Sequence, residues 1–188
     1  MWRNRCAECL SAAVGGYLKR NDRVMELGCG TGSTAMLLAP YCESIVATDF
    51  AEGMISIARE KQSDSNGQNI FFEQAEATHC LELQAFDVAM AFSLLHLVED
   101  IRSVLAAARA QRKPGGLFLT KTVCLGERGL LLKTALGCIS KLPIGPKLNF
   151  LTQEKLFRDM EAAGFEIEKI VFFGGQRFDP FIVARLAG

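Results

Sequence analysis

Short apolar runs rich in β-branched residues alternate with helix-period segments along most of this chain of 188 residues. In the helical segments, apolar residues recur every three or four positions, which is typical of helices that pack on one face. Strands that follow one another through helices form right-handed crossovers in a parallel sheet. The pattern therefore predicts an α/β fold with strands over residues 23–27, 44–48, 70–73, 86–92 and 117–123.

The last part of the chain departs from this alternation. Two strand-like runs, 165–173 and 181–186, are separated only by residues 174–180, which predicts a hairpin and one antiparallel strand. Residues 125–151 are apolar, rich in glycine and proline, and lie between two core strands. An insertion there lies over the carboxyl ends of the strands, where open α/β sheets bind ligands. We expect one domain over residues 1–188, with 125–151 as a substrate-side lid or as a segment packed on the sheet.

Composition limits the location and the partners of the chain. Lys plus Arg equals Asp plus Glu, so the zero net charge gives no electrostatic attraction to nucleic acid or to an anionic membrane. No apolar run reaches the roughly 20 residues that span a bilayer. The seven cysteines are scattered, and no secretory signal opens the chain. We expect a cytoplasmic protein with reduced thiols, no membrane insertion and no metal, with Cys6 and Cys9 as small apolar residues.

A glycine-rich segment follows the first predicted strand and opens a helix. Gly28, Gly30 and Gly32 alternate there; Gly28 permits a tight turn, and the other two let the backbone approach a ligand. Asp49 ends the second predicted strand, where a carboxylate accepts both hydrogens of a ribose diol. This arrangement predicts a nucleotide-type cofactor.

Two details favour S-adenosylmethionine over NAD. The third glycine stands one residue too early for the dinucleotide pattern G-x-G-x-x-G, and Ser33 occupies the expected position. Glu26, just before the loop, repels a pyrophosphate but suits a ligand with an amino group and a sulfonium. An NAD-dependent oxidoreductase is also disfavoured because neither tyrosine, Tyr17 nor Tyr41, begins a Tyr-x-x-x-Lys pair.

Four segments together carry a family resemblance: ELGCGTGSTA, ATDFAEGMISIAREK, FDVAMAFSLLHL and KPGGLFLTKT. They resemble successive motifs of the class I SAM-dependent methyltransferases, of the bacterial small-molecule type with a generic methyltransferase domain. The resemblance covers roughly residues 20–125, and the C-terminal runs are similar to the last hairpin of that family. It implies a Rossmann-like three-layer sandwich with a mostly parallel seven-stranded sheet. It also implies S-adenosylmethionine as cofactor and S-adenosylhomocysteine as product.

The resemblance assigns cofactor-binding roles to matching positions. Glu26 and the three glycines would bind the methionine half of the cofactor, and Asp49 would bind its ribose. The adenine side would be formed by Phe50, Met54, Glu76 and Ala77. Phe92 would line the wall of the site. Simpler alternatives make Phe50 and Met54 core residues and Glu76 a solvated loop carboxylate. Cys29, inside the loop, is interpreted as a small filler and not as a nucleophile.

Methyl transfer from a sulfonium is an in-line displacement, so the protein must mainly align the acceptor and exclude water. A general base is needed only where the acceptor must lose a proton. His96, just after the fourth strand, is the candidate catalytic residue; its alternative role is to cap or pack against a helix. His79 is predicted to be a surface or structural residue.

Several features indicate the class of acceptor. The chain lacks the N/D-P-P-Y/F motif after the fourth strand and any Pro-Cys dipeptide, which argues against nucleic-acid methylation. We therefore expect a small, apolar or amphipathic acceptor as partner, with the oligomeric state left open. A protein methyltransferase is one alternative. A cofactor-binding module without activity is another, because only about 22 residues precede the first strand.

Overall fold

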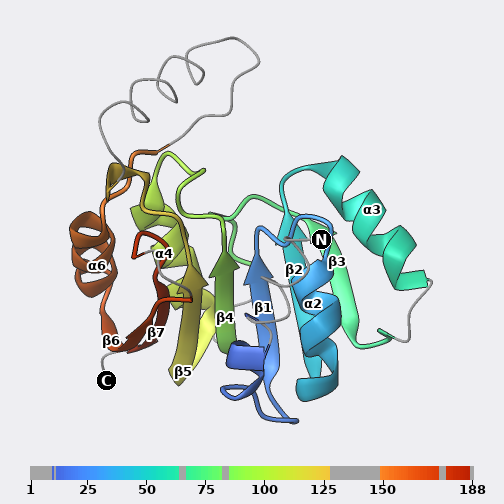
Figure 1. Ribbon diagram of the computed structural model, residues 1–188. Coiled ribbons are helices and arrows are strands. Elements are labelled where there is room, and N and C mark those ends of the chain that lie inside the picture. Colours follow the sequence, from blue (N-terminus) through green and yellow to red (C-terminus); the bar gives the residue numbers. More distant parts are fainter. Residues whose placement is uncertain are drawn as a thin grey trace.

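A seven-stranded sheet forms the centre of the molecule in the computed structural model, which describes residues 10, 12–63, 67–81, 85–127, 149–173 and 177–186 (Figure 1). Its strand order is β3-β2-β1-β4-β5-β7-β6. β7 runs antiparallel to both of its neighbours, β5 and β6, whereas the other pairings are parallel. The predicted sheet with one antiparallel strand is therefore confirmed. The strands are β1 (Arg23–Leu27), β2 (Ser44–Asp49), β3 (Ile70–Gln74), β4 (Phe86–Phe92), β5 (Arg112–Lys121), β6 (Phe165–Val171) and β7 (Phe181–Leu186).

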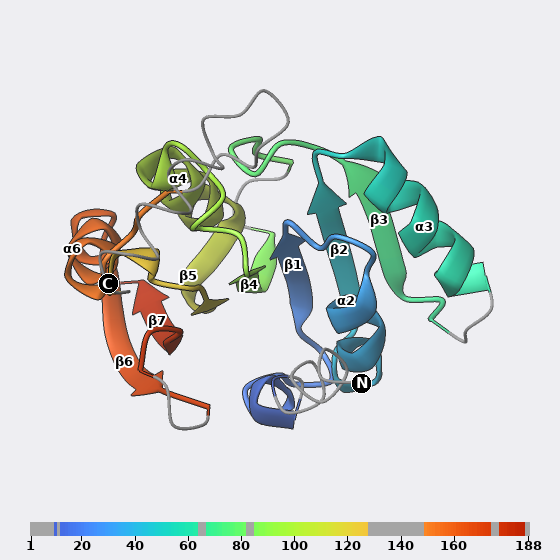
Figure 2. The same ribbon diagram turned by 45° about the horizontal axis from the view of Figure 1, so that its top comes forward.

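Helices cover both faces of the sheet, so the predicted three-layer sandwich is also confirmed (Figures 1 and 2). α2 (Ser33–Leu38) and α3 (Glu52–Ser63) pack on one face, together with the helical residues 12–15. α4 (Ile101–Gln111) and α6 (Gln153–Ala162) pack on the other. Short 3-10 turns are η1 (Ala39–Tyr41) and η2 (Leu125–Glu127). Within the described ranges, no helix is both long and apolar enough to cross a membrane.

Side chains alternate between the two faces along each central strand, as the pleat requires. In β1, Val24 belongs to the core cluster under α2 and α3, whereas Met25 and Leu27 belong to the cluster under α4 and α6. In β4 both sets of alternate residues are buried, which is why this strand reads as an almost continuous apolar run.

Strand β5 begins earlier than the sequence predicts. The sequence predicts this strand over residues 117–123, but Arg112 already pairs with Phe86. The next pair is Val88 with Leu117, so residues 113–116 bulge out of the ladder. Gly115 permits this bulge because its φ of 72° lies in the left-handed region.

Parts of two predictions lie outside the described residues. The expected lid, residues 125–151, is described only at its two ends, and nothing follows about the interval 128–148. Cys6, Cys9 and Cys138 also fall outside. The cysteines that the structure describes are free thiols, namely Cys29, Cys42, Cys80 and Cys124.

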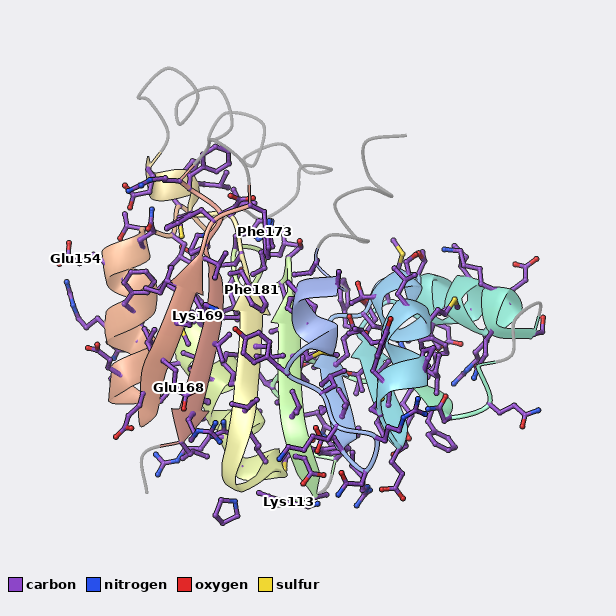
Figure 3. All side chains as sticks on the ribbon, turned by 60° about the horizontal axis from the view of Figure 1, so that its bottom comes forward. Lys113, Glu154, Glu168, Lys169, Phe173 and Phe181 are labelled. Atoms are coloured by element: carbon purple, nitrogen blue, oxygen red, sulfur yellow. The ribbon has the colours of Figure 1, made fainter. Side chains whose placement is uncertain are left out.

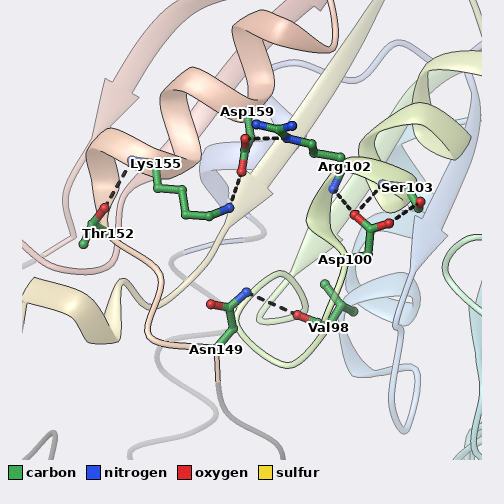
Figure 4. Close-up of polar contacts among 8 residues, drawn as sticks. All are labelled: Val98, Asp100, Arg102, Ser103, Asn149, Thr152, Lys155 and Asp159. Atoms are coloured by element: carbon green, nitrogen blue, oxygen red, sulfur yellow. Dashed lines mark hydrogen bonds and ion pairs between the residues drawn. The ribbon is translucent and has the colours of Figure 1, made fainter.

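A buried carboxylate joins α4 to α6 (Figure 4). The side chain of Asp159 is only 1% exposed, and it accepts hydrogen bonds from Arg102 Nε at 2.9 Å and from Lys155 Nζ. Both helices begin with side-chain caps, Asp100 for α4 and Thr152 for α6. Burial opposes ionisation of Asp159, but the two cations outweigh it and lower the pKa of this carboxyl.

We expect Asp159→Asn to lower the free energy of unfolding by about 2 kcal/mol at pH 7, because charge-assisted hydrogen bonds are lost. Since the folded-state pKa is lowered, this contribution is present above a pH of about 4 and disappears as the pH falls further. Urea denaturation of both proteins at pH 7 and pH 3 measures it. Glu154→Gln, which breaks an exposed pair with Arg158 on the same helix, is the control and costs less than about 0.5 kcal/mol. An equal loss in both variants contradicts the prediction.

Candidate active site

The three glycines of the loop after β1 have different surroundings, although all have positive φ. A Cβ on Gly28 would lie 2.8 Å from Leu94 Cδ1, and one on Gly32 would lie 2.5 Å from Phe72 Cζ. A Cβ on Gly30 would meet nothing within 4 Å. Gly32 is thus required for packing, and its expected role in ligand approach stays a prediction. Gly30, in contrast, borders open space that a ligand can fill.

Asp49 connects the glycine loop to the start of α3. Its Oδ2 accepts a hydrogen bond from Gly30 N at 2.9 Å, and its Oδ1 accepts one from Ala51 N at 3.0 Å. The contact forms because β1 and β2 are adjacent parallel strands, so their carboxyl ends meet at one edge. Each carboxylate oxygen has a further lone pair, so Asp49 can still accept hydrogen bonds from two ligand hydroxyls.

Glu26 is a buried acid at the carboxyl end of β1. It is 2% exposed, and its Oε2 atom is buried without a hydrogen-bond partner. Burial, and secondarily the charge of Asp49, raise the pKa of Glu26 to about 8. A buried polar atom without a partner is costly, so this oxygen marks a place where a ligand donor fits.

The expected adenine side lies at the ends of β2 and β3. Phe50 and Met54 are exposed, which argues against the alternative that they are core residues. Glu76 is exposed and accepts a hydrogen bond from Thr78 Oγ1 at 3.4 Å. An open hollow of about 360 Å³ lies beside it, lined by Gln74, Ala75, Glu76, Thr78 and His79. Ala77, in the same segment, packs against the core cluster under α4 and α6.

The carboxyl end of β4 brings an aromatic ring and a strained residue into the site. Phe92 is buried, with its ring centroid 6.4 Å from that of Phe181. Ser93 has a φ of 54°, which is uncommon outside glycine, and its N–H donates to Lys121 O at 2.7 Å. Sequence reasoning missed Ser93 because nothing in its local sequence announces a left-handed backbone. Such strain is frequently found at functional sites.

His96 lies beside the end of β5. Its Nδ1 is 3.1 Å from Thr122 Oγ1, and its carbonyl accepts a hydrogen bond from Asn149 N. Burial lowers the pKa of His96, so the imidazole is neutral near pH 7 and able to accept a proton. The predicted catalytic role stays a prediction, since the contact with Thr122 also suits a packing role.

Two further observations bear on the expected chemistry. Burial, reinforced by Glu26 and Asp49, raises the pKa of the Cys29 thiol, so this side chain is a poor nucleophile. This agrees with its interpretation as a filler. No group of three or more His, Cys, Asp or Glu side chains suited to hold a metal ion occurs in the part of the chain that the structure describes.

Sequence reasoning also missed an ion pair at the same end of the sheet. Lys121, the last residue of β5, lies 2.6 Å from Asp179, just before β7. No motif links these two residues, which are far apart in the sequence, and only the pairing of β5 with β7 brings them together.

Comparison with known proteins assigns the family. Residues 25–118 match the family model described as "Methyltransferase domain", which covers the glycine loop, Asp49 and β4. The chain therefore belongs to this family, the class I SAM-dependent methyltransferases that the sequence resembles. S-adenosylmethionine is the cofactor of the family.

Individual relatives agree with this assignment. The chain is 28% identical over 163 residues to the ubiquinone biosynthesis O-methyltransferase of Azorhizobium caulinodans, covering 84% of this chain and 63% of that protein. A putative methyltransferase from Bacillus halodurans superimposes with a TM-score of 0.78 at 17% identity, covering 94% and 97% of the two chains. Magnesium protoporphyrin IX methyltransferase from Synechocystis, solved with bound SAH, gives 0.76 at 15% identity, covering 98% and 84%. These two structures support the fold alone.

The residues present fit the cofactor. The unpartnered oxygen of Glu26 offers an acceptor for an ammonium group, and Gly30 leaves room beside the backbone. Asp49 presents a carboxylate next to that space. The roles of individual residues, as assigned from the sequence, stay predictions.

Alanine substitutions separate the two kinds of glycine. We expect Gly30→Ala to cost about 1 kcal/mol of stability, through backbone strain alone, and to weaken binding of S-adenosylhomocysteine at least tenfold. Gly32→Ala adds a clash with Phe72 and costs more than about 2 kcal/mol. Urea denaturation and calorimetry measure both quantities. If Gly30→Ala binds as tightly as the wild type, the assigned open space does not hold the ligand.

Binding of the cationic cofactor should depend on pH through Glu26. With a pKa of about 8, Glu26 is protonated at neutral pH, and a cation binds best to its ionised form. We therefore expect affinity for S-adenosylmethionine to rise with pH between 6.5 and 8 and to level off above. Calorimetry of Glu26→Gln over the same pH series provides the control, since it retains the titration of the ligand itself. Identical pH profiles for the two proteins contradict the assignment.

Proposed function

We propose that this chain transfers a methyl group from S-adenosylmethionine to a small, apolar or amphipathic acceptor by in-line displacement. The observation that carries the proposal is the buried, unpartnered oxygen of Glu26, next to a glycine loop that Asp49 holds in place. The similarity to ubiquinone biosynthesis O-methyltransferases supports a small-molecule acceptor. The chain spans 63% of the length of that relative, so the activity of the relative enters only as support.

In this proposal the residues of the chain divide the work between binding and alignment. Glu26 binds the ammonium group of the cofactor, Asp49 binds the ribose hydroxyls, and Gly30 lets the backbone approach. When bound, S-adenosylmethionine supplies a methyl group already activated by the sulfonium charge. Phe92 presents an apolar wall at the end of β4, which excludes water from the path of transfer.

His96 would remove the proton of a hydroxyl acceptor. Its neutral imidazole and its place after β4 suit that role, and Thr122 fixes the ring by a contact at Nδ1. Nε2 is then the atom that takes the proton.

We also propose, from the composition, a cytoplasmic location and no nucleic-acid partner.

Transfer of a labelled methyl group tests the proposed function. The protein is incubated with methyl-labelled S-adenosylmethionine in two separate reactions. One reaction contains a mixture of simple phenols, and the other contains a protein extract. We expect label in the phenols, whereas label in the protein fraction indicates a protein methyltransferase. Binding of S-adenosylhomocysteine without transfer to either indicates a module that has lost activity.

Calorimetry with S-adenosylhomocysteine examines Asp49. We expect Asp49→Ala to weaken binding of S-adenosylhomocysteine by roughly 1–3 kcal/mol, about 5- to 150-fold, because hydroxyl partners are lost. Glu60→Gln, an exposed acid on α3, is the matched control and retains full affinity. Unchanged affinity in Asp49→Ala counts against the ribose assignment.

Replacement of His96 tests the general base. We expect His96→Gln to lower kcat with a hydroxyl acceptor about 100-fold or more while the affinity for S-adenosylhomocysteine stays the same. In the wild type, kcat should fall as the pH drops through the lowered pKa of this histidine. Full turnover by His96→Gln eliminates the role.

A further inference from the structure

The ion pair between Lys121 and Asp179 is largely enclosed, yet only one oxygen of the carboxylate has a partner. The side chains are 11% and 21% exposed, and Lys121 Nζ lies 2.6 Å from Asp179 Oδ2. The other oxygen, Asp179 Oδ1, is buried and has no hydrogen-bond partner. An enclosed acceptor atom without a donor is costly in a folded protein, so this oxygen calls for a physical explanation.

A second Lys–Asp pair on the same strand provides a comparison. Lys113, near the start of β5, contacts both oxygens of Asp87 at 2.9 Å, and Asp87 also accepts from Arg23 N. That pair is more exposed, at 43% and 28%, and leaves neither oxygen unpartnered. An ion pair that joins two strands therefore does not require an unpartnered oxygen, but the Lys121–Asp179 pair at the opposite end of β5 has one, Asp179 Oδ1.

Strand register places the Lys121–Asp179 pair at the same end of the sheet as the candidate cofactor site. Gly28 and Phe92 directly follow the paired residues Leu27 and Ala91, and Phe92 pairs with Lys121. Lys121 thus lies two strands from the glycine loop, about 10 Å at the usual strand spacing. Leu119, two residues earlier, belongs to the core cluster under α2 and α3, so the Lys121 side chain lies on the same face as Phe92.

Aromatic rings surround the same region. The Phe181 ring lies 5.7 Å from that of Phe173 and 6.3 Å from that of Tyr17, between ring centroids. Figure 3 shows Phe173 and Phe181 close together, at the end of the sheet away from Lys113. Phe173 and Tyr17 are only half-buried, so part of each ring remains available to a ligand. An aromatic body fits such surroundings.

We propose that Asp179, held in place by Lys121, binds a hydroxyl group of an aromatic acceptor through its Oδ1 atom. The proposal rests on the proposed function and names the class of acceptor: a phenol whose ring packs against Phe173 and Tyr17. The acceptor hydroxyl donates to Asp179, and Lys121 orients the carboxylate without contacting the reacting atoms. The hydroxyl that binds to Asp179 in this way is a second hydroxyl of the ring, because His96 is assigned to the hydroxyl that is methylated.

Calorimetry with two matched probes tests the proposal. The complex of the protein with S-adenosylhomocysteine is titrated with catechol and with 1,2-dimethoxybenzene, which has the same ring but no hydroxyl donors. We expect the wild type to prefer catechol at least tenfold, and Asp179→Ala and Lys121→Met to reduce this preference to less than threefold. Asp179→Glu restores part of it. Lys113→Met, at the other end of β5, is the control and keeps the full preference.

Affinity for S-adenosylhomocysteine, measured first in each protein, reports folding and the proposed function independently. The proposal is overturned if the wild type binds S-adenosylhomocysteine but shows no preference for catechol. It is also overturned if Asp179→Ala or Lys121→Met, with that affinity intact, keeps the full preference. If the wild type fails to bind S-adenosylhomocysteine, the proposed function itself is wrong. A merely structural pair would change stability without changing the ratio between the two probes.

Discussion

The hydrogen bonds of Asp49 hold the candidate site in one piece. A single carboxylate at the end of β2 accepts from the backbone of Gly30 and of Ala51, and so fixes the glycine loop relative to α3. The sheet makes this contact available because parallel strands deliver their carboxyl ends to the same edge. The open space beside Gly30 and the orientation of the Phe50 segment both depend on it.

The electrostatics of this edge follow from the same arrangement. Burial raises the pKa of Glu26 to about 8, and the negative charge of the nearby Asp49 adds to the effect. Asp179 adds a third carboxylate and is balanced by Lys121. An edge built in this way favours a cationic ligand near β1 and a neutral hydrogen-bond donor near β5, which corresponds to the two substrates of a methyl transfer.

Local sequence predicted most of the fold because its signals are local. Strand-like apolar runs, the glycine loop and Asp49 each fall within a few residues, and the parallel order follows from the crossovers. The start of β5 could not be read this way, since Arg112 enters the sheet only through its pairing with Phe86. Lys121 and Asp179 meet through the β5–β7 pairing, and Ser93 owes its backbone to a contact with the carbonyl of Lys121. Such features depend on contacts between distant segments, which no short motif encodes.

The contact between Leu94 and Gly28 links two segments that are otherwise separate. Leu94 follows the left-handed residue Ser93 and occupies the volume that a side chain at position 28 would need. Any larger residue there must displace the side chain of Leu94, which stands two positions before His96. The small size of Gly28 is thereby matched to the segment that carries His96, the proposed base. Position 28 of the glycine loop and position 94 after β4 are consequently constrained to vary together.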